Sequence, residues 1–136
     1  RALDSGMAFL KFREWISAQG GDTDCVDDTS RFDTAAYSME IKSTGSGFIS
    51  ETNCEKIGTA AAVLGAGRIT KDDKIDLTAG IILHAKVGDY VGIGDRLATL
   101  YSNNKEKLTE AASIYKSAVV LGAAPQKQPL IYKVIK

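Results

Sequence analysis

Glycine-rich and turn-forming stretches divide this chain into short segments, and these segments follow two different hydrophobic periods. Apolar residues recur at helical spacing in three segments, over residues 7–19, 53–64 and 104–122. Alternating or continuously apolar runs, typical of strands, cover residues 37–44, 47–50, 79–86, 87–102 and 128–136. The expected order is a helix, a linker and then β-β-α-β-β-α-β. Because the two types do not alternate strictly, the pattern favours an α+β fold over a doubly wound sheet.

Two of the predicted helices have an N-cap residue and an apolar face that can be recognised in the sequence. Thr52 or Asn53 is expected to cap the second helix, and its apolar face comprises Ile57, Ala60, Ala61 and Leu64. Asn104 is expected to cap the third, whose apolar face comprises Leu108, Ala111, Ala112 and Tyr115. Strand 79–86 is continuously apolar and is predicted to be buried, and the closing strand 128–136 begins near Pro129.

Charge and cysteine content exclude several classes of function. The 136 residues contain 17 basic and 17 acidic side chains, which gives no electrostatic reason to expect a nucleic-acid or membrane-surface partner. No apolar run is long enough for a membrane span, and residues 1–20 do not resemble a signal peptide. Two separated cysteines and one histidine cannot form a zinc set, so free thiols in the cytoplasm are expected. A chain that starts at Arg1 is expected to be a piece of a longer protein.

The stretch VLGAGRITKDDKID, residues 63–76, has two interpretations. Glycines followed by a basic residue can hold phosphate, but a phosphate-binding loop needs the helix to begin after the glycines. Here the helix precedes them, so its negative end faces the loop. We therefore favour a helix cap, with Gly65 or Gly67 ending the helix and Arg68 offsetting its dipole.

Other reactive side chains have equally plain interpretations. His84 lies within an apolar strand and has no nucleophile nearby in sequence, so a structural role is favoured. Cys54 stands at a helix start, where the dipole lowers a thiol pKa, but no base accompanies it. The acidic cluster lacks the glycine and terminal glutamate of a calcium loop and is expected to be a solvated linker. Its members are Asp22, Asp24, Asp27 and Asp28, and Asp72 and Asp73 form a similar charged turn. The sequence thus predicts no catalytic, cofactor-binding or metal-binding residue.

The segment KVGDYVGIGDRLATLY, residues 86–101, resembles the hairpin of biotinyl and lipoyl carrier domains in its G-D-x-V-x-x-G-x-x-L spacing. Those domains carry a modified lysine in an exposed turn, where this chain has Ser102, Asn103 and Asn104. A free-standing carrier or interaction module that shares the shape remains an alternative.

Several segments together resemble the C-terminal third of bacterial pyrimidine-nucleoside phosphorylases. They are ALDSGMAFLKFREWISAQGGD, GFIS, IGTAAAVLGAGRITKDDKIDLTAGIILHAKVGDYVGIGDRLATLY and PLIYKVI. The resemblance implies an α/β-hammerhead domain, similar to barrel-sandwich hybrids, at residues 37–136. Residues 1–20 would then be the last helix of an upstream α/β domain, and residues 21–36 a linker.

The family also implies a reaction, the reversible phosphorolysis of uridine, thymidine or deoxyuridine to a free base and a pentose 1-phosphate. Phosphate is the co-substrate, and the motifs that bind phosphate, base and sugar belong to upstream domains and have no match here. Arg68 and His84 do not correspond to them, so this chain alone is expected to be inactive. The resemblance further implies a cytoplasmic homodimer that assembles through an N-terminal helical domain. Thymidine phosphorylase and AMP phosphorylase are close alternatives.

Overall fold

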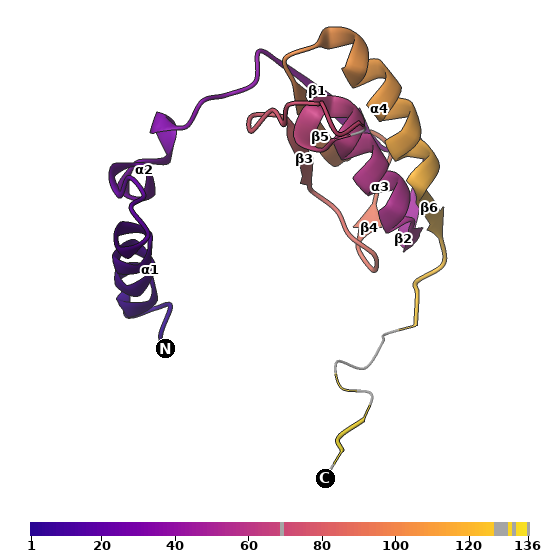
Figure 1. The fold of residues 1–136 in the computed structure, drawn as a ribbon. Helices are drawn as coiled ribbons and strands as arrows, with labels where there is room; N and C mark the ends of the chain where they lie inside the picture. The colour runs from indigo at the N-terminus through magenta and orange to yellow at the C-terminus, as the bar shows by residue number, and fades with distance from the viewer. Residues whose placement is uncertain (69, 127–130, 132, 136) are drawn as a thin grey trace. The chain divides into compact units, whose positions relative to one another are not determined.

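A computed structural model of the chain describes residues 1–68, 70–126, 131 and 133–135. The contacts divide it into two units, Arg1–Thr34 and Ala35–Lys136. Figure 1 shows the ribbon and the labels of the helices and strands. Within the described residues, no helix is both long and apolar enough to cross a membrane.

The first unit is helical. Helix α1 (Met7–Ala18) matches the predicted helix over 7–19, and it is followed by the single turn α2 (Asp24–Asp27) and the 3-10 turn η1 (Thr29–Arg31). The sequence gives residues 21–36 no period, and the two short turns arise from local side-chain bonds instead. Asp22 accepts a hydrogen bond from the Asp24 N–H at 2.8 Å, and Asp28 accepts one from the Ser30 N–H at 3.0 Å.

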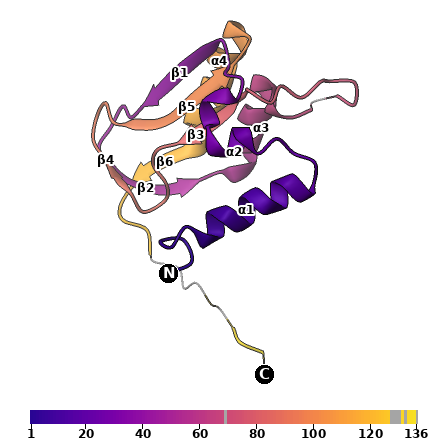
Figure 2. The ribbon, with the colours of Figure 1, turned by 90° about the vertical axis from the view of Figure 1, so that its left-hand side faces the viewer.

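In its described residues, the second unit contains two three-stranded antiparallel sheets and two main helices. One sheet has the order β1–β5–β3, from Tyr37–Lys42, Arg96–Ser102 and Gly80–Leu83. The other has the order β4–β2–β6, from Tyr90–Val91, Gly47–Thr52 and Val119–Gly122. Figure 2 shows the strands of both sheets. This mixture of separate helices and antiparallel sheets is the α+β class that the sequence predicts.

Two helices supply much of the core of this unit. Helix α3 (Cys54–Ala61) continues into the π-helical turn η2 (Ala62–Ala66) and packs against helix α4 (Lys105–Ala118). Helix α4 also lies on β1 and β5 (Figure 1). The predicted face of α4 is confirmed, because all four of its residues are buried. On the predicted α3 face Ala60 and Leu64 are buried, whereas Ile57 and Ala61 are only partly buried. The strands contribute Ile41, Ile49 and Leu100 to the same core.

The segment over residues 86–101 contains two Gly-Asp turns that have the same construction. In the first, Asp89 accepts a hydrogen bond from the Lys86 N–H at 2.8 Å, and Gly88 has a φ of 97°. In the second, Asp95 accepts one from the Gly92 N–H at 2.7 Å, and Gly94 has a φ of 89°. A positive φ at the third position of a four-residue turn favours glycine, so each turn needs its Gly-Asp pair.

Two sequence predictions require correction, and a third falls mainly outside the described residues. Strand 79–86 was expected to be buried, yet β3 is an edge strand, and Ile82 and Leu83 are 52% and 43% exposed. The helix predicted over 104–122 ends at Ala118, because the following residues pair with β2, with Val119 opposite Thr52. The closing strand over 128–136 falls mainly outside the described residues, and the described positions 131 and 133–135 are not in a strand.

Hydrogen exchange should separate the two long helices of the 136-residue chain. No residue of α1, which the structure describes in full, is buried, whereas α4 buries five residues. A short helix without tertiary packing is marginal in water, so the α1 amides should exchange far faster than the central α4 amides. Peptide-resolved exchange mass spectrometry measures both helices in one sample. Equal protection of α1 at every protein concentration would contradict this expectation.

Candidate functional site

The stretch with the most functional interest in the sequence is the loop that follows α3, residues 65–78, which we call the glycine–arginine loop. Asn53 caps α3 by accepting a hydrogen bond from the Lys56 N–H at 2.9 Å, and the helix runs directly into this loop. Gly65 has a φ of 116°, and a Cβ there would lie 3.3 Å from the Cβ of Asp76. Both facts favour glycine at position 65 and agree with its predicted role at the helix end.

Asp76 holds the far end of the loop in place. Its N–H donates to the Gly65 carbonyl at 2.9 Å, and its carboxylate accepts from the Thr78 N–H at 2.9 Å and hydroxyl at 2.7 Å. The Asn103 amide donates to the same carboxylate at 2.9 Å, which ties the loop to the start of α4. The Thr78 hydroxyl, then its N–H, and more weakly Asn103, lower the pKa of Asp76. We call these contacts the Asp76 lock.

The Asp76 lock predicts a pH-dependent contribution to stability. Since the pKa of Asp76 is lowered in the folded state, its contribution is present above the unfolded value of 3.8 and is lost as the pH falls further. Asp76→Asn should therefore lower the urea midpoint at pH 7, and the difference from the parent should shrink below that value. Asp72→Asn, an exposed change on the same loop, is the charge-matched control. A difference that stays constant down to pH 2.5 or so would show that the ionised carboxylate is not what stabilises the loop.

Arg68 lies on the exposed side of the glycine–arginine loop. Beside it is a depression of about 510 Å³, lined by Ala62, Gly65, Gly67, Thr70, Asp73, Lys74 and Lys107. Among the described residues, Arg68, Lys74 and Lys107 form no ion pair. The C-terminal end of α3 faces this loop, so the local dipole opposes a bound phosphate despite the nearby lysines. The arrangement favours the helix-cap interpretation over a phosphate cradle.

His84 lies one residue beyond β3 and is exposed, rather than inside a buried strand. Its Nε2 is 2.8 Å from the hydroxyl of the buried Thr99. A polar depression of about 630 Å³ adjoins it, but the side chains around that space have structural contacts. Asp89 and Asp95 accept hydrogen bonds from turn N–H groups, and Arg96 pairs with Glu40 at 3.0 Å. The Thr99 hydroxyl that contacts His84 is buried, so among the described residues this surface presents no accessible nucleophile beside His84.

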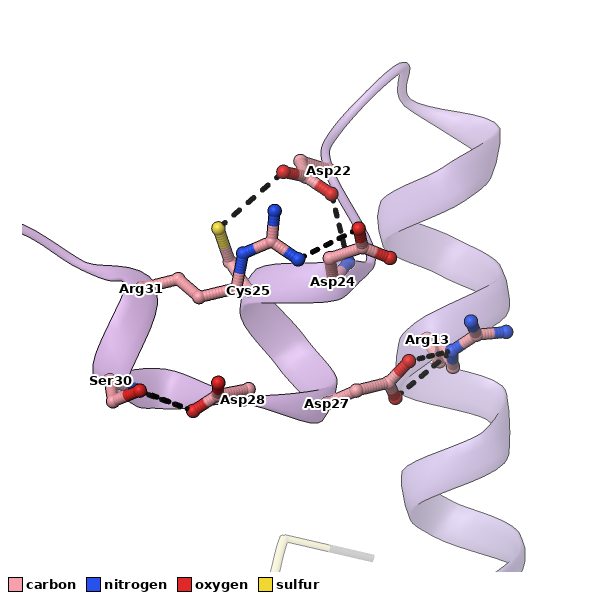
Figure 3. Close-up of polar contacts among 8 residues, drawn as sticks. All are labelled: Arg13, Asp22, Asp24, Cys25, Asp27, Asp28, Ser30 and Arg31. Carbon is pink, nitrogen blue, oxygen red and sulfur yellow. Dashed lines mark hydrogen bonds and ion pairs between the residues drawn. The ribbon is translucent and has the colours of Figure 1, made fainter.

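The acidic cluster of the first unit is more ordered than a solvated linker (Figure 3). Asp27 pairs with Arg13 of α1 at 2.9 Å, and Asp24 pairs with Arg31 of η1 at 2.8 Å. Each of these exposed pairs contributes little to stability, and each joins a carboxylate of this stretch to a neighbouring helical element. The Cys25 thiol lies 3.7 Å from Asp22, and burial first, then that carboxylate, raises the pKa of the thiol. A raised pKa makes Cys25 a poor nucleophile.

No predicted candidate is brought together with another into a reactive group. Over the described ranges, no three histidine, cysteine, aspartate or glutamate side chains are arranged to hold a metal ion. Cys54 is exposed at the start of α3, with no recorded hydrogen-bonding partner among the described residues. Sequence reasoning overlooked the Asp76 lock. The spacing Asp-x-Thr at 76–78 is a local signal for it, whereas Asn103 is 27 residues away and gives none.

The second unit is thus an α+β domain of two small antiparallel sheets covered by paired helices, with a glycine-ended helix and two Gly-Asp turns. Residues 48–122 match the family model described as the pyrimidine nucleoside phosphorylase C-terminal domain. Over 134 residues the chain is 42% identical to the pyrimidine-nucleoside phosphorylase of Bacillus subtilis (strain 168), covering 98% of this chain and 30% of that protein. It is 39% identical to that of Geobacillus stearothermophilus, covering 97% and 30%, and 40% identical to that of Staphylococcus haemolyticus (strain JCSC1435), covering 98% and 31%.

The chain belongs to the pyrimidine-nucleoside phosphorylase family, as its C-terminal region. It spans about 30% of the length of the curated relatives it matches. The resemblance found from the sequence segments is therefore confirmed.

Proposed function

We propose that this chain is the C-terminal region of a pyrimidine-nucleoside phosphorylase. The whole enzyme would catalyse reversible phosphorolysis of uridine, thymidine or deoxyuridine, giving the free base and a pentose 1-phosphate with phosphate as co-substrate. One observation carries the proposal: nearly the whole chain, 98% of it, aligns with 30% of a protein that bears this name. In such a reaction catalysis consists mainly of positioning and of stabilising the departing base.

We also propose a division of roles along the chain. Residues 37–136 form the C-terminal domain, residues 21–36 a linker, and residues 1–20 the last helix of the upstream α/β domain. The surface of α1 supports this, because Phe9, Phe12 and Trp15 are 49%, 44% and 57% exposed. Burial of such side chains contributes about 1.5–3 kcal/mol each, so an upstream domain that covers them would be strongly stabilised. The phosphate-, base- and sugar-binding groups would then lie upstream.

The assembly and location follow the same proposal. The whole enzyme would be a cytoplasmic homodimer that associates through its upstream helical domain, with no nucleic-acid or membrane partner. The equal numbers of acidic and basic residues support the absence of a nucleic-acid partner.

The direct test is an assay of the longer protein that carries this chain at its C-terminal end. Incubation with uridine, thymidine or deoxyuridine and phosphate should release the free base and a pentose 1-phosphate, with release dependent on phosphate. The relative rates also distinguish uridine preference from thymidine preference, and AMP as a substrate tests the third alternative. A protein that releases no base from any of these substrates would overturn the proposal.

The two Gly-Asp turns favour one alternative, a carrier or interaction module with the same hairpin. Intact mass spectrometry of the protein from its native source distinguishes it, because a lipoyl or biotinyl adduct adds a defined mass. An unmodified mass together with phosphorolysis would exclude the carrier.

Arg68→Ala in the whole enzyme should lower stability slightly and leave turnover nearly unchanged. As a cation beside a helix C-terminus, Arg68 contributes about 0.3–1 kcal/mol, and less at high salt. Melting temperature and kcat measured on the same preparation test this expectation, with Lys71→Ala on the same loop as the charge-matched control. A steep fall in kcat at unchanged melting temperature would instead assign Arg68 to closure between domains.

A further inference from the structure

An apolar cavity of about 350 Å³ lies in the second unit, where β2 runs into α3 and where β3 leads into the first Gly-Asp turn. Most of its wall is aliphatic and is formed by Ile57, Leu83, Ala85 and Val87. Tyr115 completes this wall, and its hydroxyl already has a partner, because it donates to the carbonyl of Leu97 at 3.4 Å. The volume lies at the lower end of the range for small-molecule sites, which suits a small ligand better than a helix or strand of another protein.

The cavity also has a positive charge at its edge. Among the described residues that line it, Lys86 is the one that is charged. Lys86 is exposed, and over the described ranges no ion pair includes it. Asp89 accepts a hydrogen bond from the Lys86 backbone N–H at 2.8 Å, a contact that does not use the ammonium. Since a lysine stem lies along apolar surface while its ammonium stays in water, Lys86 supplies a cation beside the apolar wall.

The interior of the cavity does not require a polar ligand group. Within the described part of the chain, every buried side-chain nitrogen and oxygen has a hydrogen-bonding partner. The part of a ligand that enters therefore meets apolar side chains, apart from the Thr52 hydroxyl and the Cys54 thiol. A complementary ligand has an apolar body and one anionic group at its end.

We propose that this cavity binds a small aliphatic carboxylate, a medium-chain fatty acid in its ionised form. The carboxylate lies at Lys86, and the chain lies along Ile57, Leu83 and Val87. Removal of the chain from water supplies most of the affinity. The Lys86 ammonium adds selectivity for the anionic head group, because opposite charges attract more strongly beside low-dielectric apolar surface than in bulk water. The inference does not depend on the proposed enzyme activity.

Octanoate is the probe, added to the full 136-residue chain below its micelle-forming concentration and followed by amide chemical shifts. Saturable shifts are expected at residues 52–57 and 83–87, with a dissociation constant of about 1 mM or tighter. Hexanoate, which is two methylenes shorter, should bind about tenfold more weakly. 1-Octanol offers the same chain length without the charge and serves as the neutral comparison.

Two substitutions separate the contributions of charge and chain. Lys86→Gln should weaken octanoate binding about threefold and leave 1-octanol binding unchanged, and Lys116→Gln, an exposed change outside the cavity, is its charge-matched control. Val87→Asn should weaken the binding of both ligands about fivefold. Ile93→Asn, at a position that is 75% exposed and does not line the cavity, should weaken neither. If a melt shows that Lys86→Gln is destabilised, Lys86→Met removes the same charge and replaces it in the comparison.

Each outcome decides the proposal. Saturable shifts around the cavity, with a loss on Lys86 substitution that is confined to octanoate, support it. The absence of saturable shifts up to about 10 mM octanoate overturns it. Shifts concentrated at the exposed aromatic residues of α1 also overturn it, because the ligand would then bind apolar surface in general. Equal affinities of the Lys86 and Lys116 variants for octanoate overturn the anionic ligand class. Shifts of the cavity amides on dilution of the ligand-free chain overturn it too, because the occupant would then be a second copy.

Discussion

A pure sample of residues 1–136, mixed with uridine or thymidine and phosphate, is expected to release no free base above the uncatalysed rate. Phosphorolysis needs groups that hold phosphate and donors that stabilise the leaving pyrimidine. Of the candidates in this chain, His84 is hydrogen-bonded to the Thr99 hydroxyl. Arg68 is exposed beside the C-terminal end of a helix, where the helix dipole opposes a bound phosphate. Because enzymes typically accelerate reactions about a millionfold or more, an active site of ordinary efficiency would be visible by chromatography of the base.

The whole enzyme, assayed in parallel, shows that the substrates and conditions are competent. Contamination by a host phosphorylase is tested with the Arg68→Ala, His84→Ala double variant purified in the same way. Base release that is present in the parent chain and lost in this variant would place an active site within residues 1–136. Base release that is equal in both and disappears from the parent chain on further purification comes from the contaminant, whereas release that persists at constant specific activity contradicts the expectation.

The helices of the second unit could be predicted well because their signals are local. Asn104 accepts hydrogen bonds from the Glu106 and Lys107 N–H groups at 2.9 Å and 3.3 Å, as its position before an amphipathic run suggests. The 3.6-residue period of the following residues coincides with the buried face of α4. Both signals depend only on residues within a few positions of one another.

The strands that were mispredicted depend on distant partners. Val119 and Val120 continue the helical run in sequence, but pairing with β2, almost seventy positions earlier, makes them a strand. In β3 the apolar run suggested burial on both faces, yet burial depends on position within the sheet, and this strand lies at an edge. No local sequence pattern indicates which strand will lie at the edge of a sheet.

The candidate site shows the same limit. The glycine at the end of α3 could be read from the sequence, because a helix period stops there and a positive φ follows. The hydrogen bond between Asn103 and Asp76 could not be predicted, since nothing in the sequence around either residue points to the other as its partner. In the first unit, the pairs Arg13–Asp27 and Arg31–Asp24 likewise convert a turn-rich stretch into an ordered one.

Leu108→Ala should destabilise the second unit by about 2–5 kcal/mol, the range for removing a buried leucine side chain. Leu108 is 2% exposed and belongs to the core that α4 forms with α3 and the strands. Alanine is a better helix former than leucine, so the helix itself would not be weakened, and the loss reports packing alone. Since the free energy of unfolding of a small domain is about 5–15 kcal/mol, a loss of this size should markedly lower the urea midpoint.

Glu110→Ala is the matched control, because Glu110 is exposed on the same helix and its change should alter stability by no more than about 0.5 kcal/mol. Comparing the stability losses of the two variants distinguishes the buried face of α4 from its solvent-exposed face within one helical turn. A loss below about 1 kcal/mol for Leu108→Ala, similar to the control, would mean that α4 does not pack as described. The helix face predicted from the 3.6-residue period would then be wrong, and the paired helices could not form the core of the domain.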